Sequence, residues 1–400
     1  MTTLAEVISI LAPGRAPVGT EQVAVTGVCL DSRLAGPGSL FVALSGERAD
    51  GHDYVASALN AGAVAVLVQR PVDGVALLDL RPGAAIAAGP LTAPVALRVP
   101  DTLLALQRLA QARRAAHPAL RVVGVTGSVG KTTAKEAIGS VLAERYRTLK
   151  SAGNHNNEIG LPLTLMGLEP AHERAVLEMG MYALGEIALL CRIARPQVGV
   201  VLNVEPVHLE RLGSLERIAL AKAELVEALP PDGLAVLHGD DPLVRAMAGR
   251  SLAPALTFGL GPGNHVWADG VESLGLEGAY LVVHVAADNP LGLSAGEQPL
   301  RTTLLGRHAA LPALAAAAVG LADGLTWDEI GRGLVALRHG LRLVPRSGLR
   351  GAVLLDDAYN ASPSSVVAAL DVLTALPGRH LAVLGDMLEL GAYEREGHRL

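Results

Sequence analysis

The sequence predicts an α/β protein whose largest part is a doubly wound, mainly parallel sheet. Three observations support this fold class. Between residues 100 and 338, β-branched runs alternate with helical stretches, which is the order of a parallel sheet with crossover helices. The strand expected at 122–126 runs through a glycine-rich turn directly into an amphipathic helix. Half of the 400 residues are hydrophobic, which is enough for the cores of two or three domains.

The N-terminal segment, residues 1–99, is predicted to be a smaller α/β domain. Its expected elements are a helix at 54–62 and short strands at 23–30, 39–44, 63–68 and 95–99. Polar and charged residues concentrate in its loops, at 31–33, 45–47 and 50–52. Loops of this kind beside an apolar scaffold often bind ligands. Such residues also serve as turns and helix caps, and the sequence leaves both interpretations open.

The central segment, residues 100–338, is predicted to bind its ligands at the carboxyl ends of its strands. The expected strands after 122–126 are 174–178, 197–204 and 234–237, and the expected helices are 184–194 and 214–229. Glu178, Asn203 and His208 fall at or just after strand ends. A carboxylate and an imidazole that meet there are candidate ligands of a hard divalent cation, with Glu the more typical for Mg²⁺. The alternative for a histidine in a loop is an ordinary polar residue with satisfied hydrogen bonds.

Residues 339–400 begin a second α/β pattern. Expected strands at 352–355 and 380–384 enclose a helix at 364–376, and a helix-like tail ends at Leu400. Two strands and about one helix are too few for an independent parallel sheet. We therefore expect either that this segment pairs with the rest of the chain or that the chain is a shortened version of a longer protein.

The glycine-rich turn at 127–133 carries the strongest chemical signal. It reads GSVGKTT, follows a buried strand and opens a helix. Its glycines let backbone N–H groups converge on phosphate oxygens, and the helix N-terminus adds positive potential. Lys131 would reach the β- and γ-phosphates, and the Thr132 hydroxyl would bind Mg²⁺. Val125 stands where the usual phosphate-loop pattern has glycine, so the loop is a T-G-x-x-G-K-T variant.

Lysine usage singles out a second residue. Of the 33 basic residues only four are lysines, at 131, 135, 150 and 222. Such a composition keeps lysine mostly where a compact charge or a neutral amine is needed, since arginine supplies neither. Lys131 is explained by the phosphate loop. Lys222 has only apolar neighbours at helical spacing, Ile218, Ala219, Leu225 and Val226, which disfavours an ordinary surface ion pair.

Composition excludes several classes of protein. Aromatic residues make up 2% of the chain and the net charge is −6, which disfavours a nucleic-acid binder. Cys29 and Cys191 are too few for a disulfide framework or a cysteine metal cluster, and are typical of core residues in a reducing compartment. The N-terminus lacks a basic signal-peptide region, and no apolar run reaches the ~18 residues of a membrane span. We expect a cytoplasmic protein.

A set of motifs occurs in one order along almost the whole chain. They are TGSVGKTT, GNHNNEIGLPLTL, LEMG, the span from His208 to Lys222, LLGRH, DDAYNASP and LGDMLELG, after an N-terminal block DSR…PGSLFVAL…DGHDY. Together they resemble the Mur ligases. The resemblance implies three domains: an N-terminal UDP-binding domain, a central ATP-binding phosphate-loop domain, and a C-terminal Rossmann-like ligase domain, here shortened.

The resemblance also implies an activity. DDAYNASP, LGDMLELG and GNHNNEIG are similar to the branch of the family that joins D-alanyl-D-alanine to UDP-N-acetylmuramoyl-tripeptide, whereas the D-N-P-R signature of a neighbouring branch is absent. The implied enzyme is an ATP-dependent carboxylate–amine ligase that uses Mg²⁺ and forms an acyl phosphate. It would act as a monomer in cytoplasmic peptidoglycan precursor synthesis, and so in cell-wall biogenesis, cell shape and division.

Four groups of site residues follow from the resemblance. The implied catalytic residues are Lys131, Lys222, His208 and Arg342. Nucleotide binding is implied for Gly127, Ser128, Val129, Gly130, Lys131, Thr132, Thr133 and Asp357. The implied metal ligands are Thr132, Glu178, His208 and Lys222 as a carbamate. Substrate binding is implied for Ser32, Arg33, Ser45, Asn156, Asn157, Tyr359 and Asn360.

The chain departs from the family at the adenine site. After G-x-H the family usually continues with two asparagines, but this chain has Ala309 and Pro312 there. The departure implies weaker or backbone-based recognition of the base. Three rival classes remain: a sibling ligase acting on a folate-like acceptor, a phosphate-loop GTPase or kinase, and an inactive binding protein. The N-terminal block argues against the first, and the lack of an N-K-x-D motif argues against a GTPase.

Overall fold

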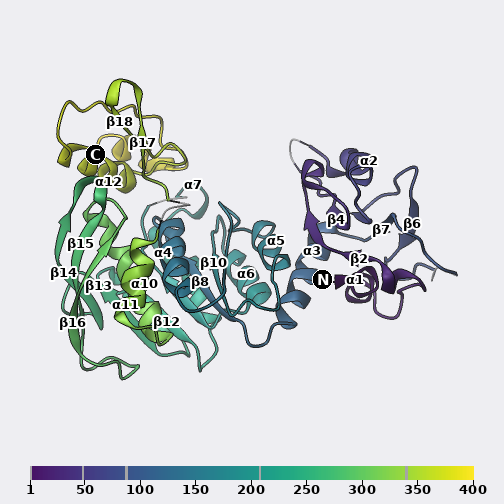
Figure 1. Cartoon of the computed structure of the whole chain (residues 1–400), viewed down its shortest axis with the longest axis horizontal. Helices are drawn as coiled ribbons and strands as arrows, with labels where there is room; N and C mark the ends of the chain where they lie inside the picture. Colours follow the sequence, from purple (N-terminus) through teal and green to yellow (C-terminus); the bar gives the residue numbers. More distant parts are fainter. Residues whose placement is uncertain (1, 47–48, 86–88, 207–208, 338–340) are drawn as a thin grey trace. The chain divides into compact units, whose positions relative to one another are not determined.

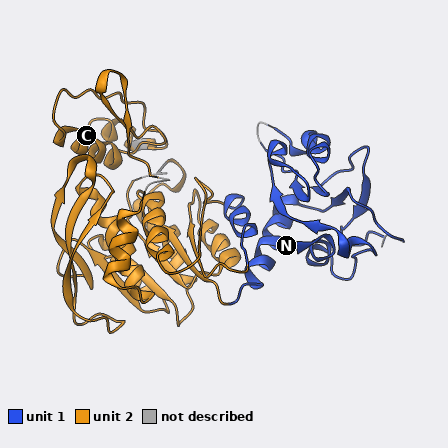
Figure 2. Cartoon of the chain, in the orientation of Figure 1, with its two compact units in different colours: residues 1–118, 158–169 blue, residues 119–157, 170–400 orange. Residues whose placement is uncertain are grey.

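The computed structural model describes residues 2–46, 49–85, 89–206, 209–337 and 341–400. The chain divides into two compact units (Figure 2). Unit 1 comprises residues 1–118 and 158–169, and unit 2 comprises residues 119–157 and 170–400. None of the helices in the described part is long and apolar enough to cross a membrane.

Unit 1 is built on a five-stranded parallel sheet with the order β3-β4-β5-β7-β6. Its strands are β3 (Gly27–Cys29), β4 (Ser39–Val42), β5 (Ala65–Val68), β6 (Ala76–Asp79) and β7 (Val95–Arg98). A short pair, β1 (Thr2–Thr3) and β2 (Ala24–Val25), lies outside this sheet. The helices are α1 (Leu4–Leu11), α2 (Val55–Asn60), α3 (Thr102–Ala115) and α5 (Gly160–Met166). All residues of β4 and β5 are buried, as expected for strands covered on both faces.

Most elements expected in the N-terminal segment are confirmed. Strands occur within 39–44, 63–68 and 95–99, while the run at 23–30 forms two short strands instead of one. Several elements were not predicted, among them β6 and α1. Strand β6 lies at the sheet edge, and its Ala76 and Leu77 are exposed although the run is apolar in sequence. Helix α1 is short, and its signal is the capping box of Thr3 and Glu6.

Unit 2 contains a nine-stranded sheet with the order β16-β15-β14-β13-β12-β11-β8-β10-β9. The strands from β9 across to β14 are parallel, and β14, β15 and β16 form an antiparallel edge. The bounds are β8 (Arg121–Thr126), β9 (Thr148–Lys150), β10 (Arg174–Glu178), β11 (Val198–Val201), β12 (Leu234–His238), β13 (Ala255–Gly259), β14 (Val266–Ser273), β15 (Ala279–Val285) and β16 (Gly296–Thr302). The mainly parallel, doubly wound sheet predicted from the sequence is confirmed.

Helices cover both faces of this sheet, as Figure 1 shows for α4, α10 and α11 on one of them. The helices are α4 (Lys131–Ala143), α6 (Glu186–Ala194), α7 (Leu209–Leu212), α8 (Leu215–Glu227), α9 (Pro242–Arg245), α10 (Ala310–Ala322) and α11 (Trp327–Val335). Val123 and Val125 of β8 pack in the core shared with α4 and α10. Gly124 faces the opposite side, where a Cβ atom would lie 2.9 Å from Leu225 of α8. Alternate residues of β8 therefore serve the two layers.

The last part of unit 2 differs from the prediction. It contains an antiparallel hairpin of β17 (Val344–Ser347) and β18 (Val353–Asp356), then α12 (Pro363–Ala375) and α13 (Glu394–Gly397). The strand predicted at 380–384 is wrong, because none of its residues pairs with a strand in the described part of the chain. Val383 is 98% exposed. An apolar run becomes a strand only beside a partner with free hydrogen-bonding groups, and sequence pattern alone does not supply that partner.

Candidate active site

The phosphate loop lies between β8 and α4. Strand β8 ends at Thr126, whose hydroxyl donates to the Met179 carbonyl at 2.8 Å. Gly130 has a φ of 83° before α4 begins at Lys131. This left-handed conformation favours glycine and turns the chain into the helix. The next strand in the sheet, β10, pairs Glu178 with Val125. Glu178 therefore lies at the carboxyl end of the sheet, where the phosphate loop begins.

Asn203 holds the loop from the end of the neighbouring strand β11. Its Oδ1 accepts hydrogen bonds from the N–H groups of Ser128 (2.8 Å) and Val129 (2.9 Å), and its Nδ2 donates to the Val129 carbonyl (3.1 Å). The Ser128 hydroxyl accepts from the Glu205 N–H (2.8 Å) and donates to its carbonyl (3.1 Å). Because two loop N–H groups are bonded to Asn203, the first turn of α4 supplies the N–H groups open to a phosphate.

Lys131 folds back over its own loop. Its Nζ donates to the carbonyls of Gly127 at 2.7 Å and Ser128 at 3.0 Å. Burial lowers the pKa of this lysine, and the positive charge of Arg342 lowers it further, against the opposing carboxylates of Glu178 and Glu205. A phosphate bound at the loop would offer the amine a charged acceptor in place of these two neutral carbonyls. Hydrogen bonds between charged groups are stronger than those to carbonyls, so the amine could turn to the phosphate.

Glu178 and Thr132 carry oxygen atoms suited to a magnesium ion. Glu178 is 1% exposed, and its Oε1 accepts from Asn156 Nδ2 at 3.0 Å. Its Oε2 is buried with no hydrogen-bond partner among the described residues. A buried carboxylate oxygen without a partner is costly, and an oxygen-preferring cation would satisfy it. The Thr132 hydroxyl accepts from Arg342 at 3.2 Å and is a second oxygen ligand of the kind Mg²⁺ takes.

The remaining predicted metal ligands are His208 and the carbamate of Lys222. His208 lies outside the described residues. Among the residues that are described, no three His, Cys, Asp or Glu side chains gather as a metal cluster. The part of the predicted ligand set that the structure describes is therefore Thr132, Glu178 and Lys222.

Lys222 is 1% exposed in the middle of α8. Burial lowers its pKa well below the ordinary lysine value, the charge of Lys131 lowers it further, and Glu205 opposes the shift. A surface ion pair is thereby excluded. The nearby Glu224 instead accepts hydrogen bonds from the N–H groups of Gly185 (2.6 Å) and Ala188 (2.9 Å) at the start of α6. A buried amine with a lowered pKa has the neutral form that reacts with carbon dioxide.

Three predicted residues from the last part of the chain gather near the loop. Besides its bond to Thr132, Arg342 places its guanidinium 4.0 Å from the ring centre of Tyr359. Burial raises the pKa of the Asp357 carboxyl, while Arg342 lowers it and Asp356 raises it. Asn360 is exposed. Arg342 thus joins the phosphate-loop helix to the DDAYNASP motif.

Known proteins are similar to this chain in sequence. The profile described as "Mur ligase middle domain" matches residues 125–320, and that described as "Mur ligase family, catalytic domain" matches residues 24–114. The UDP-N-acetylmuramoyl-tripeptide–D-alanyl-D-alanine ligase of Bacillus subtilis (strain 168) is 39% identical over 382 residues, which cover 95% of this chain and 77% of the relative. The chain belongs to the Mur ligase family. The enzyme of the same name from Escherichia coli (strain K12) is 37% identical over 381 residues, 94% of this chain and 78% of the relative.

Solved Mur ligase structures resemble it throughout. MurF from Acinetobacter baumannii matches with a TM-score of 0.83 at 32% identity, covering 99% of this chain and 82% of that one. MurF from Thermotoga maritima in complex with ADP matches with a TM-score of 0.76 at 30% identity, covering 94% of this chain and 81% of that one. The fold class expected from the motifs is confirmed.

In this Mur ligase the expected uridine-binding loops are held by local contacts. Asp31 caps a 3₁₀ turn and pairs with Arg33 at 2.6 Å. The Ser45 hydroxyl donates to Asp50 at 3.3 Å, and Asp50 also accepts from the His52 N–H at 3.0 Å. The turn-and-cap interpretation is therefore confirmed for the two aspartates. A ligand role for Ser32, Arg33 and Ser45 stays a prediction.

The departure at the adenine site has a structural counterpart. Ala309 and Pro312, which replace the usual asparagines, are both buried at the start of α10. Burial also lowers the pKa of His308, which the nearby charge of Asp371 opposes. A side-chain amide at either position would have to be accommodated in the core. Positions 309 and 312 therefore offer no side-chain amide, and weaker or backbone-based recognition of the base stays a prediction.

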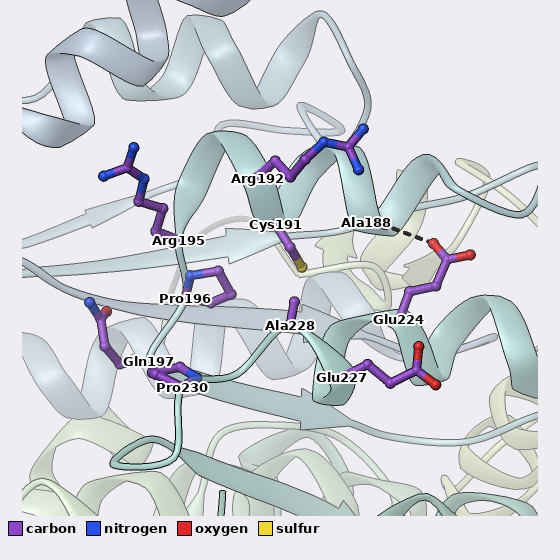
Figure 3. Close-up of a pocket in the computed structure, with 10 residues that line it drawn as sticks. All are labelled: Ala188, Cys191, Arg192, Arg195, Pro196, Gln197, Glu224, Glu227, Ala228 and Pro230. Atoms are coloured by element: carbon purple, nitrogen blue, oxygen red, sulfur yellow. Dashed lines mark hydrogen bonds between the residues drawn. The ribbon is translucent and has the colours of Figure 1, made fainter. Parts of the chain in front are cut away.

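A separate groove of about 630 Å³ lies between α6 and α8 (Figure 3). It includes Gln197, directly before β11, so it opens at the amino ends of the strands and away from the phosphate loop. Its polar groups already serve the fold: Gln197 accepts from the Val122 N–H at 2.8 Å, and Glu224 caps α6. Burial raises the pKa of the Cys191 thiol to about 12, which keeps it protonated. The groove is lined by none of the predicted site residues.

Proposed function

We propose that this Mur ligase joins D-alanyl-D-alanine to the terminal carboxylate of UDP-N-acetylmuramoyl-tripeptide at the expense of ATP. One observation carries the proposal: three features meet at the carboxyl ends of the central strands. They are the phosphate loop with Lys131, the buried Glu178 with an unpartnered oxygen, and the contact between Arg342 and Thr132. The names of the relatives supply the substrates.

The residues divide the work between binding and charge neutralisation. The first-turn N–H groups of α4 and the Lys131 amine would bind the phosphates, with Arg342 adding positive charge. Thr132 and Glu178 would hold Mg²⁺, which supplies further neutralisation of phosphate charge. In-line transfer of this kind needs little covalent chemistry from the protein, so positioning and preorganised charge account for most of the rate.

The reaction balances in two steps. A carboxylate oxygen of the tripeptide attacks the γ-phosphorus of ATP, the bond to the β–γ bridging oxygen breaks, and an acyl phosphate and ADP result. The neutral amine of D-alanyl-D-alanine then attacks the acyl carbon, inorganic phosphate leaves, and the amine loses a proton as the amide forms. Lys131 and Arg342 would neutralise the charge of the transferred phosphoryl group in the first step.

Lys222 is proposed to act as a carbamate. Its amine would attack carbon dioxide, lose a proton, and become an anion on α8. Support comes from its burial and from the lowered pKa of the amine, which favours the neutral nucleophile. With His208, the carbamate would serve a second metal position. An arginine at 222 would carry no carbamate.

Ser32, Arg33 and Ser45 would bind the uridine nucleotide. The peptide and the acceptor would be bound by four further residues: Asn156, Asn157, Tyr359 and Asn360. We also propose that the enzyme works as a monomer, as the resemblance to the family implies. Cytoplasmic action is supported by two buried free cysteines, which are typical of a reducing compartment.

The test is phosphate release by the purified full chain with ATP, Mg²⁺, UDP-N-acetylmuramoyl-tripeptide and D-alanyl-D-alanine, followed by mass measurement of the product. We expect release to require all four components, and the product mass to equal the sum of both substrates minus water. Two tripeptides with different diamino acids would define the third position. Release that is independent of D-alanyl-D-alanine, or a product whose mass differs from that sum, would refute the proposal.

A further inference from the structure

Lys135 and Lys150 are the two lysines that the proposed chemistry does not use. The structure joins them through one carboxylate, that of Glu136. Lys135 Nζ lies 3.0 Å from Glu136 Oε1, and Lys150 Nζ lies 2.5 Å from Glu136 Oε2. This Lys135–Glu136–Lys150 cluster connects α4, the helix of the phosphate loop, to the end of β9.

The cluster is buried at its centre. Lys135 is 0% exposed, and its Nζ also donates to the Ser151 carbonyl at 2.8 Å. A buried ammonium is tolerated only when it is paired and hydrogen-bonded, and apolar side chains of similar volume often stabilise a core at least as well. Stability alone therefore does not explain a charged group here. What the cluster adds is a fixed distance between α4 and Ser151.

Helix α4 is shaped to receive the other lysine. A Cβ atom at Gly139 would lie 2.2 Å from Cδ and 2.7 Å from Cγ of Lys150. The missing side chain at 139 leaves room for the Lys150 stem to pack directly on the helix. The end of β9 thus packs against α4, the helix whose first turn carries Lys131 and Thr132.

Ser151 passes this placement on to Glu178. Ser151 is buried, its N–H donates to the Val176 carbonyl at 3.1 Å, and its hydroxyl accepts from the Glu178 N–H at 3.2 Å. Further along the same segment, Asn156 donates to Glu178 Oε1 and accepts from the Gly180 N–H at 2.8 Å. Both the backbone and the carboxylate of Glu178 are held by the segment that Lys135 fixes at its start.

We propose that Lys135 is a positioning residue for the metal-binding carboxylate of Glu178. By fixing Ser151 against α4, it sets the place of Glu178 relative to the Thr132 hydroxyl, and a divalent cation must reach both. The inference rests on the magnesium site of the proposed function. Groups that orient metal ligands typically change metal affinity by about 10- to 100-fold when removed.

The experiment compares two matched variants of the full chain, Lys135→Met and Lys150→Met. Each removes one ammonium and one ion pair to Glu136, but only Lys135→Met removes the hydrogen bond to Ser151. Mn²⁺ binding in the presence of ADP is measured by electron paramagnetic resonance, with no turnover required. We expect Lys135→Met to weaken Mn²⁺ binding about tenfold or more, and Lys150→Met to have a much smaller effect. Equal shifts in the two variants, or no shift in Lys135→Met, would overturn the inference.

Two further variants keep the outcome decisive. If Lys135→Met does not fold, Ser151→Ala removes the hydroxyl that accepts from the Glu178 N–H and keeps the carbonyl that Lys135 bonds. Weaker Mn²⁺ binding at an unchanged Tm supports the Ser151–Glu178 step on which the inference depends, and unchanged binding overturns the inference. Glu178→Gln tests the metal site itself. Wild-type Mn²⁺ affinity in Glu178→Gln would remove the proposed metal site, whereas a loss there with none in Lys135→Met would remove only the positioning role.

Discussion

Asn203 and Val129 bond to each other at both ends of the Asn203 amide: Oδ1 accepts from the Val129 N–H at 2.9 Å and Nδ2 donates to the Val129 carbonyl at 3.1 Å. The side chain thus replaces the strand partner that the loop lacks. Strands β8 and β11 pair up to Thr126 and Val201, and Asn203 continues that contact into the phosphate loop. The loop is thereby held in shape from the neighbouring strand.

Asn203→Ala is expected to weaken ADP binding. The change leaves the N–H and the carbonyl of Val129 without the Asn203 amide, while the Ser128 N–H keeps its bond to the backbone carbonyl of residue 203. A polar group left unpaired away from water costs about 1–3 kcal/mol. The loop then loses its fixed conformation, and ADP binding must restore it. We therefore expect ADP affinity, measured by isothermal titration calorimetry, to fall about tenfold or more. Asn203→Asp is the control that keeps the acceptor and loses the donor, with added repulsion of phosphate. Unchanged ADP affinity in Asn203→Ala would contradict the role.

Lys131→Ala is expected to abolish acyl-phosphate formation and weaken ATP binding. Loss of a charge contact to the transferring phosphoryl group typically costs ~3 kcal/mol or more, which is a factor of ~10² or greater. The measurement is ATP-dependent phosphate release with both substrates present. Lys131 is only partly buried, so a lower Tm is not expected to explain the loss. Near-normal turnover would show that Lys131 is not the phosphate-binding lysine.

The sequence predicted the parts of this site that depend on local pattern. The phosphate loop, the strand end at Glu178 and the burial of Lys222 follow from glycine spacing, hydrophobic runs and apolar neighbours at helical spacing. The Asn203 clamp was foreseen only as a polar residue at a strand end. Its contacts depend on strand order, since β11 and β8 are neighbours in the sheet although they are far apart in the chain.

Other features needed the three-dimensional context. Asn156 was expected to meet the substrate, and the structure shows its amide on Glu178, where sequence spacing alone gives no contact. In the cluster around Glu136, Lys150 contacts a carboxylate 14 positions earlier in the chain. The contact depends on β9, which ends at Lys150 and begins three residues before Ser151. The strand predicted at 380–384 failed because its β-like composition has no partner in the described chain. Each of these outcomes depends on contacts between segments that are distant in the chain, which the local sequence pattern does not specify.

Amide hydrogen exchange is expected to be faster across residues 345–400 than in β8. Strand β8 is buried from Val122 to Thr126 and has a paired strand on each side. In the described side chains of the later region, the buried apolar ones are Val372, Met387 and Leu390. Few buried contacts imply low-energy local opening. Hydrogen-exchange mass spectrometry checks this, and protection equal to that of β8 would refute it.

Lys222→Ala is expected to be inactive and partly restored by acetate. If Lys222 is a carbamate, the variant lacks an anion that a small carboxylate replaces near the metal. We expect a loss of about a hundredfold or more, as when other preorganised charges of a reaction site are removed. Lys222→Arg is expected to stay inactive because a guanidinium carries no carbamate. Acetate should leave Lys131→Ala unchanged, and full activity in Lys222→Arg would rule the carbamate out.

The pH dependence of stability tests the buried state of Lys222 directly, without turnover. Its pKa is lowered in the folded chain, chiefly by burial. Between that folded pKa and the ordinary lysine value of about 10.4, the unfolded chain binds more protons than the folded one, so the free energy of unfolding must rise with pH. Lys222→Met removes this contribution. In buffer free of carbon dioxide, we expect Lys222→Met to have a higher Tm than the wild type at neutral pH, with the difference shrinking as the pH approaches 10. A difference that does not change with pH would mean that the amine is solvated, and the carbamate proposal would lose its physical basis.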